Sequence, residues 1–392
     1  MGAGAFYRAR SCIEEAFGLI KEEAAGASCA FLECGFIMKK IGILNFQYSN
    51  HNYGAVLQAA ALEYVLRELG HEPKHIDFIA QPKVSLKGLF GKLLRQLSVK
   101  KTSKVMNEEA FERFRLSLLN RTARIRSMQD FSNTAGLFDV VLVGSDQVWR
   151  PAFAKDTIAF FLGYVPQGVD RVSYAASFGT ETWEQANDAV LTLSVREELR
   201  QFKAISCREE SGVEICNEVF GVEAVHVLDP LLMIDDAFFD KIISQSSVAP
   251  GAKLVYYKLD ASADFQADLE AIGARSKTTA VNIYLKESSV QEYREVFDWV
   301  AMIHGAETVV TDSFHCICLA LRFGKEVIYC PNEKRGKTRL DSLFKKLNVQ
   351  ADPLDIESKT PMFSLIRQGD IDTILEEERK QSLKFLRDAL HG

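Results

Sequence analysis

The sequence predicts an α/β protein built on doubly wound parallel sheets. Short apolar runs, typical of buried strands, alternate with longer stretches whose apolar residues recur at helical spacing. One such alternation covers residues 40–78, and a second set begins at residue 253. Between them, residues 140–143 are apolar without interruption, which is typical of a central strand in a parallel sheet. Strands that alternate with helices in this way predict a layered α/β fold.

Composition limits the class of protein. The chain has 392 residues, and at about 150 residues per domain this length suggests two or three domains. The net charge of −6 argues against a general nucleic-acid binder, and no apolar run approaches the ~20 residues of a membrane span. The eight cysteines contain no CxxC pair and no zinc-ligand spacing, so they fit the reducing cytoplasm.

Changes in character along the chain predict its domain organisation. Residues 1–37 do not share the pattern that follows, and we interpret them as an N-terminal extension that a misassigned start would explain. We predict a first Rossmann-like domain over 38–235 and a second over 250–365. The polar, Pro- and Gly-containing stretch 233–252 is the predicted linker. A long amphipathic helix over 370–391 is expected to pack across both domains.

The first α/β unit is well marked. Residues 40–46 form a predicted strand, residues 55–69 a helix ended by a glycine, and residues 76–78 the start of the next strand. Asn52 and Tyr53 belong to the polar loop after the first strand, where residues can contact a ligand. A plain turn explains them equally well.

Two basic stretches stand out in this acidic protein. Residues 83–104 carry basic side chains and no acidic one, with leucines interleaved at helical spacing. Such a segment can lie on an anionic membrane, which would place the protein at the periphery of the inner membrane; a helix packed on its own domain is the alternative. Residues 332–339 follow a predicted strand, and their lysines and arginines can hold phosphate.

Polar residues follow two further predicted strands. After the strand at 138–143, Asp146 can orient a sugar hydroxyl and Trp149 can stack on a sugar ring; the alternatives are a turn cap and a core residue. Arg208 follows the strand at 202–206. Its guanidinium matches a carboxylate or phosphate group, and a salt bridge to the glutamates that follow it is the alternative.

The unit from residue 306 to residue 324 carries the clearest chemical signal. A buried strand at 306–310 is followed by three good N-cap residues at 311–313, an apolar helical run at 317–323, and Gly324 as a C-terminal cap. The free N–H groups and dipole of the first helical turn favour an anion. His315 lies in that turn and can transfer protons near neutral pH. A helix start with an incidental histidine is the alternative.

Several strings in this order and spacing resemble the polysaccharide pyruvyl transferase family over roughly residues 39–390. They are Asn52–Gln58, Gly144–Trp149, Tyr174–Gly179, Arg208-Glu209, Asp229-Pro230 and Thr311–His315. The resemblance implies a GT-B-like architecture of two Rossmann-like domains facing a cleft. It also implies transfer of pyruvate from phosphoenolpyruvate onto a sugar as a ketal, with release of phosphate. One departure is Cys316, where family members commonly have glycine.

The resemblance also implies roles for particular residues. His315 is the expected catalytic acid/base. The donor phosphoenolpyruvate would be bound by Arg208, Ser313, Phe314 and His315. The acceptor would be bound by Asn52, Tyr53, Asp146 and Trp149. The expected acceptor is a bacterial cell-surface polysaccharide, such as an exopolysaccharide, or its lipid-linked precursor. No cofactor beyond this co-substrate and no metal is expected.

Two other functions fit the same residues. A nucleotide-sugar glycosyltransferase of GT-B type would use the same cleft, anion site and histidine. A non-catalytic glycan-binding or assembly protein could use the inherited fold. The sequence does not name the sugar or its hydroxyl pair.

Overall fold

A computed structural model describes residues 37–80, 105–249, 251–259, 261–286, 290–330, 337–354, 364–367 and 371–391. The predictions made for residues 1–36, for the basic stretch 83–104 and for residues 332–336 lie outside these ranges. Among the described residues, no helix combines the length and apolar character that crossing a bilayer requires.

The first sheet is parallel throughout, with strand order β2-β1-β3-β4. Its strands are β1 (Lys40–Leu44), β2 (Glu72–His75), β3 (Val140–Val143) and β4 (Asp170–Ser173). All side chains of β3 are buried, as expected for a central strand. Isolated bridges extend the sheet from β4 towards the parallel pair β5 (Ser206–Cys207) and β6 (Val225–His226).

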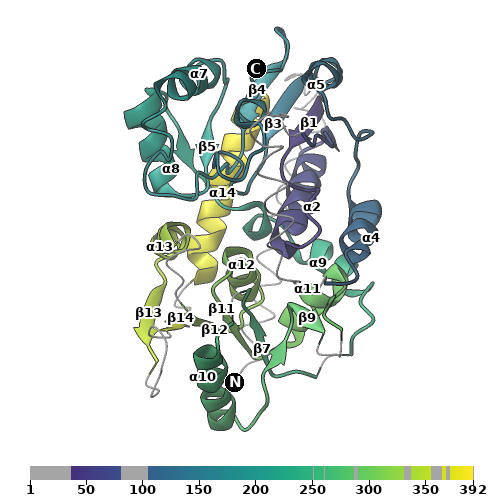
Figure 1. Ribbon diagram of the computed structural model, residues 1–392, viewed down its shortest axis with the longest axis vertical. Coiled ribbons are helices and arrows are strands. Elements are labelled where there is room, and N and C mark those ends of the chain that lie inside the picture. Colours follow the sequence, from purple (N-terminus) through teal and green to yellow (C-terminus); the bar gives the residue numbers. More distant parts are fainter. Residues whose placement is uncertain are drawn as a thin grey trace, which may run out of the picture.

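Helices of the first half pack around this sheet. They are α2 (Tyr53–Glu68), α4 (Glu109–Leu118), α5 (Met128–Ala135), α6 (Thr157–Phe160), α7 (Ala189–Leu199) and α8 (Glu210–Ile215). Short π- and 3₁₀-helical turns follow at Cys216–Phe220 and Pro230–Leu232. The α2 helix is buried along most of its length, because it lies between the two sheets (Figure 1).

The second sheet has the order β13-β14-β12-β11-β7-β8. Its strands are β7 (Leu254–Tyr257), β8 (Val281–Asn282), β11 (Thr308–Thr311), β12 (Glu326–Tyr329), β13 (Gln350–Pro353) and β14 (Ser364–Arg367). The strands from β12 to β8 are parallel, while β14 and β13 run antiparallel at one edge. The elements around it are α10 (Ala263–Arg275), the hairpin of β9 (Leu285–Lys286) and β10 (Glu292–Tyr293), α11 (Val296–Gly305), α12 (Phe314–Arg322) and α13 (Lys337–Lys346). The predicted α/β class with two Rossmann-like units is confirmed.

Some predicted elements differ from the structure in extent or in type. The second strand was predicted at 76–78, and the structure places β2 at Glu72–His75. The stretch 233–252, predicted as a linker, contains helix α9 (Asp236–Ile243). Asp235 caps this helix through Phe238 N, and its apolar face is buried in the main core. Burial of Phe238, Phe239 and Ile242 stabilises a helix here, although the residues around it are polar.

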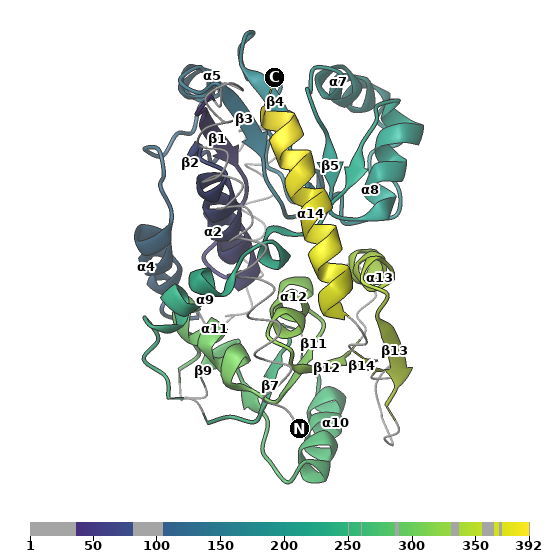
Figure 2. The same cartoon turned by 180° about the vertical axis from the view of Figure 1, so that it is seen from behind.

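Helix α14 (Ile371–Leu390) runs along the back of the molecule beside both sheets (Figure 2). Its Ser382 Oγ accepts a hydrogen bond from Leu228 N in the first half, at 3.0 Å. Its Glu378 pairs with Lys346 of α13 in the second half, at 2.6 Å. One hydrophobic core contains residues of β1, α2, α11, α12 and α14. The two halves therefore share packed side chains.

Candidate active site

The start of α12 forms one side of the candidate site. Strand β11 ends at Thr311, and Ser313 takes the N-cap position with extended backbone. In the described chain, the side chain of Ser313 makes no capping hydrogen bond to the helix. Instead, Ser313 N donates to Thr311 Oγ1 at 3.0 Å. The N–H groups of the first turn thus lack the usual side-chain cap, and they remain suited to an anion.

Arg208 lies at the centre of the site and is only 2% exposed. Its Nη1 donates to Asp229 Oδ2 at 2.9 Å and lies 3.0 Å from His315 Nε2. Burial disfavours the charged guanidinium, but Asp229, Asp146 and Glu209 outweigh this and hold the pKa of Arg208 above its ordinary value. The structure thus joins the strand-end arginine to the histidine of α12, 107 residues away. The predicted alternative, a salt bridge to the following glutamates, is wrong.

His315 Nε2 faces two charged residues of the site. An arginine has no acceptor atom, so in the 3.0 Å contact Arg208 Nη1 donates and His315 Nε2 accepts. Nε2 is also 3.6 Å from Asp229 Oδ2, which is long for a hydrogen bond but within ion-pair distance. The imidazole therefore lies against both members of the Arg208–Asp229 pair.

Asp229 accepts hydrogen bonds from several residues of the site. Its Oδ2 accepts from Ser145 Oγ at 2.8 Å as well as from Arg208, and its Oδ1 accepts from Leu231 N. Burial opposes ionisation, but the contacts with His315 and Arg208 hold the pKa of Asp229 well below its ordinary value. Asp229 is therefore a charged, fully buried partner that fixes the orientation of the guanidinium.

A second arginine approaches the same aromatic ring. The guanidinium carbon of Arg208 lies 4.3 Å from the ring centre of Phe314, and that of Arg339 lies 5.7 Å from it. Burial and the nearby charge of Arg208 lower the pKa of Arg339 to about 10. Two buried cations around one ring, at the positive end of a helix, make a region that favours an anion.

Arg208 also has unused hydrogen-bonding capacity. Its Nε and Nη2 make no hydrogen bond with any described residue. Nη2 has an ion-pair contact of 3.6 Å with Asp146 Oδ1, beyond hydrogen-bond distance. Buried donors of this kind usually have partners. They are available to a planar anionic group, such as a carboxylate or phosphate.

Gly54 brings the first half of the chain against His315. It lies in the first turn of α2, and a Cβ added there would overlap the imidazole, at 2.7 Å from the Cβ of His315. Asn52 caps the same turn by accepting from Ala55 N at 3.2 Å. Asn52 is half-buried, and its side-chain oxygen is therefore occupied by the local structure of the helix.

Two residues predicted to contact the acceptor lie in the core instead. Tyr53 is fully buried, stacks on Trp299, and hydrogen-bonds through its hydroxyl to the backbone of Tyr284 and Arg294. Trp149 is also fully buried; it stacks on Phe161, and its Nε1 donates to Phe160 O at 2.9 Å. In this structure neither ring can reach a sugar. The core alternative given for Trp149 is the correct one.

Asp146, predicted to contact the acceptor, lies beside Arg208. It is buried and adopts a positive φ of 85°, which is rare for a residue with a side chain. Its Oδ1 accepts from Gln147 N at 2.9 Å and faces Arg208. Strained residues of this kind are common where a side chain must be aimed. The structure thus brings Asp146, Arg208, Phe314 and His315 together.

The described residues contain no group of three or more His, Cys, Asp or Glu side chains that could hold a metal ion. The thiols beside His315 belong to the core. Cys316 and Cys318 are fully buried, and burial raises the pKa of both well above the ordinary value. They act as small apolar side chains.

Sequence reasoning did not assign a role to Asp229 or Ser145. Asp229 was noticed only as part of an Asp-Pro string, because nothing local shows that its carboxylate faces Arg208. Arg339 had a stronger signal, since it ends the basic run predicted to hold phosphate. All three become site residues only through contacts with residues that are distant in the sequence.

Comparisons with known proteins give two kinds of similarity. The chain is similar in structure to a UDP-N-acetylglucosamine 2-epimerase from Listeria monocytogenes, with 12% identity, a TM-score of 0.48, and 91% and 92% of the two chains covered. The corresponding enzyme of Neisseria meningitidis, bound to UDP-GlcNAc, has 11% identity, a TM-score of 0.43 and 89% and 94% coverage. Comparison with curated proteins finds no match.

The second similarity is to a family. The model of the family described as polysaccharide pyruvyl transferase matches residues 52–334, which is most of the chain. The match includes Gly54, Asp146, Arg208, Asp229 and His315, which meet in the site. This chain belongs to the polysaccharide pyruvyl transferase family.

Proposed function

We propose that the protein transfers pyruvate from phosphoenolpyruvate onto two hydroxyls of a sugar, which belongs to a polysaccharide or its lipid-linked precursor. The bond between C2 of the enol and the phosphate oxygen breaks, and two C2–O bonds to the sugar form. Of the two protons that the hydroxyls lose, one ends on C3, which becomes a methyl group, and one leaves with phosphate. The product is a ketal, and no oxidant or reductant is needed.

The observation that carries this proposal is the pairing of Arg208 with His315 at the start of α12. Phosphoenolpyruvate has two anionic groups, a carboxylate and a phosphate. The free Nε and Nη2 of Arg208 suit one of them, and the uncapped first turn of α12 suits the other. Arg339 adds a further positive charge beside Phe314. A proton donor then stands directly beside the bound enol.

His315 is the proposed acid/base. Its Nε2 accepts a hydrogen bond from Arg208 Nη1. A bound phosphate would draw the guanidinium away from Nε2 and add negative charge, both of which favour a proton on the ring. We therefore expect His315 to hold a second proton mainly when the donor is bound. It can then protonate C3 or exchange protons with the attacking hydroxyl.

The test is phosphate release from phosphoenolpyruvate, with and without a pool of candidate glycosides, for the wild type and for His315→Ala. His304→Ala is the control, because this histidine is exposed on α11. Release that needs a glycoside, is lost in His315→Ala and persists in His304→Ala would support the proposal.

The opposite outcomes are equally specific. Release that survives in His315→Ala would remove the histidine from the chemistry. Competition by a nucleoside diphosphate, without any stabilisation by phosphoenolpyruvate, would replace the proposal with a glycosyltransferase. Glycan binding that is lost in His315→Ala, with no turnover in the wild type, would point to a non-catalytic binding protein.

A further inference from the structure

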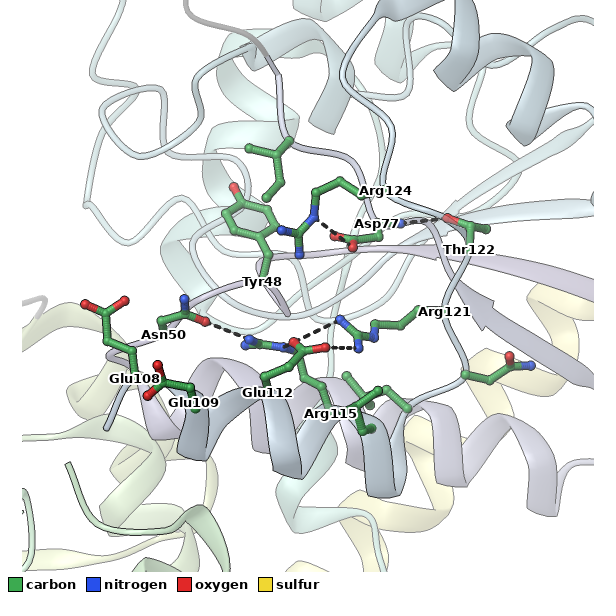
Figure 3. Close-up of a pocket in the computed structure, with 14 residues that line it drawn as sticks. Tyr48, Asn50, Asp77, Glu108, Glu109, Glu112, Arg115, Arg121, Thr122 and Arg124 are labelled. Carbon is green, nitrogen blue, oxygen red and sulfur yellow. Dashed lines mark hydrogen bonds and ion pairs between the residues drawn. The ribbon is translucent and has the colours of Figure 1, made fainter. Parts of the chain in front are cut away.

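A polar pocket of about 860 Å³ lies in the first half of the chain (Figure 3). It is formed by the segments that follow β1 and β2, by helix α4, and by the residues after α4. Its volume is within the usual range for small-molecule sites, roughly 300–1,000 Å³. The described residues that line it do not include His315, Arg208 or Asp229.

Ion pairs hold two walls of the pocket in place. In the view of Figure 3, Tyr48 and the pair of Arg124 with Asp77 lie above, and Glu112 with Arg115 and Arg121 lies below. Arg115 Nη1 also donates to Ser49 O at 2.8 Å. Because these side chains already bind one another, the pocket is formed before any ligand arrives.

The charges of the pocket nearly cancel. Of the described residues that line it, four are carboxylates and three are guanidinium groups. A strongly anionic ligand would meet Glu108 and Glu109, which are exposed at one side. A neutral ligand with many hydroxyls finds both donors and acceptors. This is the chemistry of an uncharged sugar.

Apolar side chains also line the pocket, and the apolar face of a sugar ring can pack against them. Tyr48 and Ile79 are half-buried, and Leu116 is 72% exposed on α4. A sugar ring has an apolar face that can cover such side chains. Burial and the charges of Asp77 and Asp146 raise the pKa of Tyr48 to about 12, so its hydroxyl stays a hydrogen-bond donor. Tyr48 is thus a half-buried aromatic ring that lines the pocket, whereas Trp149 is fully buried in the core.

The pocket and the candidate site are both formed at strand ends of the first sheet. It opens at the ends of β2 and β1, and the Asp146 loop follows β3, the next strand of the same sheet. Two strand spacings are about 10 Å. Asn50 lines the pocket, and Gly54, which follows it closely in the chain, lies against the ring of His315. An extended molecule could thus reach from the pocket to His315.

We propose that this pocket binds a neutral sugar of the acceptor other than the sugar that receives pyruvate. The assignment rests on the proposed function and adds to it a second sugar-binding site, separate from the reacting centre, that takes an uncharged sugar. A monosaccharide would contact only the region beside His315 and would leave the pocket empty. Chain length, and not only the terminal sugar, then decides which glycans are used.

The experiment compares variants on a printed array of neutral, uronic-acid and amino-sugar glycans from one to four sugars long. Leu116→Asp places a charge in the pocket, and Leu137→Asp is its matched control, since both leucines are 72% exposed. Arg124→Ala opens the pair with the buried carboxylate of Asp77, and Arg200→Ala removes an exposed arginine–glutamate pair outside the pocket. The rise in Tm with phosphoenolpyruvate reports on the donor site of each protein separately.

The expected result is binding of neutral oligosaccharides over monosaccharides, weakened at least tenfold in Leu116→Asp and Arg124→Ala but not in the two controls. Equal binding by all proteins, or a preference for uronic-acid glycans, would overturn the assignment. A loss of the phosphoenolpyruvate-induced rise in Leu116→Asp would also overturn it, because the change would then act on the donor site. Pocket-dependent glycan binding without phosphate release from phosphoenolpyruvate would overturn the transfer alone and support a neutral-glycan site.

Discussion

Gly54 leaves the space that the imidazole of His315 occupies. The two residues are far apart in sequence, yet a methyl group at position 54 would overlap the ring. The first turn of α2 thus forms a wall behind the proposed acid/base. The first half of the chain thereby limits the position of a side chain that belongs to the second half.

Gly54→Ala should therefore lower activity by about 100-fold, since a displacement of about 1 Å costs this much. The control is Gly136→Ala, where an added Cβ would meet its nearest neighbour at an ordinary 3.5 Å. Phosphate release from phosphoenolpyruvate in the presence of glycosides measures the effect. Wild-type turnover in Gly54→Ala would show that the wall has no role in placing His315.

Arg208→Ala should destabilise the protein by about 3–5 kcal/mol, because it leaves the buried carboxylate of Asp229 without its partner. Removing both charges in Arg208→Ala/Asp229→Ala should recover part of this loss. Unfolding in urea measures the stability of Arg208→Ala, of Asp229→Ala and of the double variant. Arg200→Ala, whose pair with Glu197 is exposed, should change stability by about 0–1 kcal/mol. A double variant as unstable as the sum of the two single variants would argue against the coupling.

The depressed pKa of Asp229 predicts a pH dependence of stability with a definite sign. The contribution of this carboxylate is complete above the ordinary aspartate pKa of about 3.9. It is lost as the pH falls from there through the lower pKa of the folded state, because the unfolded chain takes up the proton first. The free energy of unfolding of the wild type should therefore approach that of Asp229→Asn only in acid. Urea titrations of both proteins between about pH 7 and pH 3 would reveal a constant difference if this were wrong.

Tyr53→Phe tests the assignment of this residue to the core. Its hydroxyl accepts from Arg294 N at 2.9 Å and lies 3.0 Å from Tyr284 O, so the change leaves backbone groups without a partner. We expect a loss of about 1–3 kcal/mol in stability and an unchanged KM for the acceptor. Denaturation and acceptor kinetics give the two readouts. A raised KM without loss of stability would return Tyr53 to the acceptor site.

Much of the fold follows from local patterns. The strands at β1 and β3 and the strand–turn–helix of β11 and α12 lie where apolar periodicity and N-cap residues predicted them. Gly324 has the positive φ of 62° expected of its cap position. The anion-favouring start of α12 was also predictable, because a helix creates this potential by itself. Helix α9 was missed, since its short apolar run is flanked by aspartates and serines.

The sequence alone determined the α/β class, the elements and the residue types suited to an anionic donor. Only the tertiary structure decided which of them meet. Arg208, Asp229 and His315 converge from separate strand ends, and Tyr53 and Trp149, which carry equally suggestive polar groups, are enclosed by the core. The reason is physical. Backbone periodicity is a property of neighbours in sequence, whereas burial and pairing depend on side chains that come from the other half of the chain.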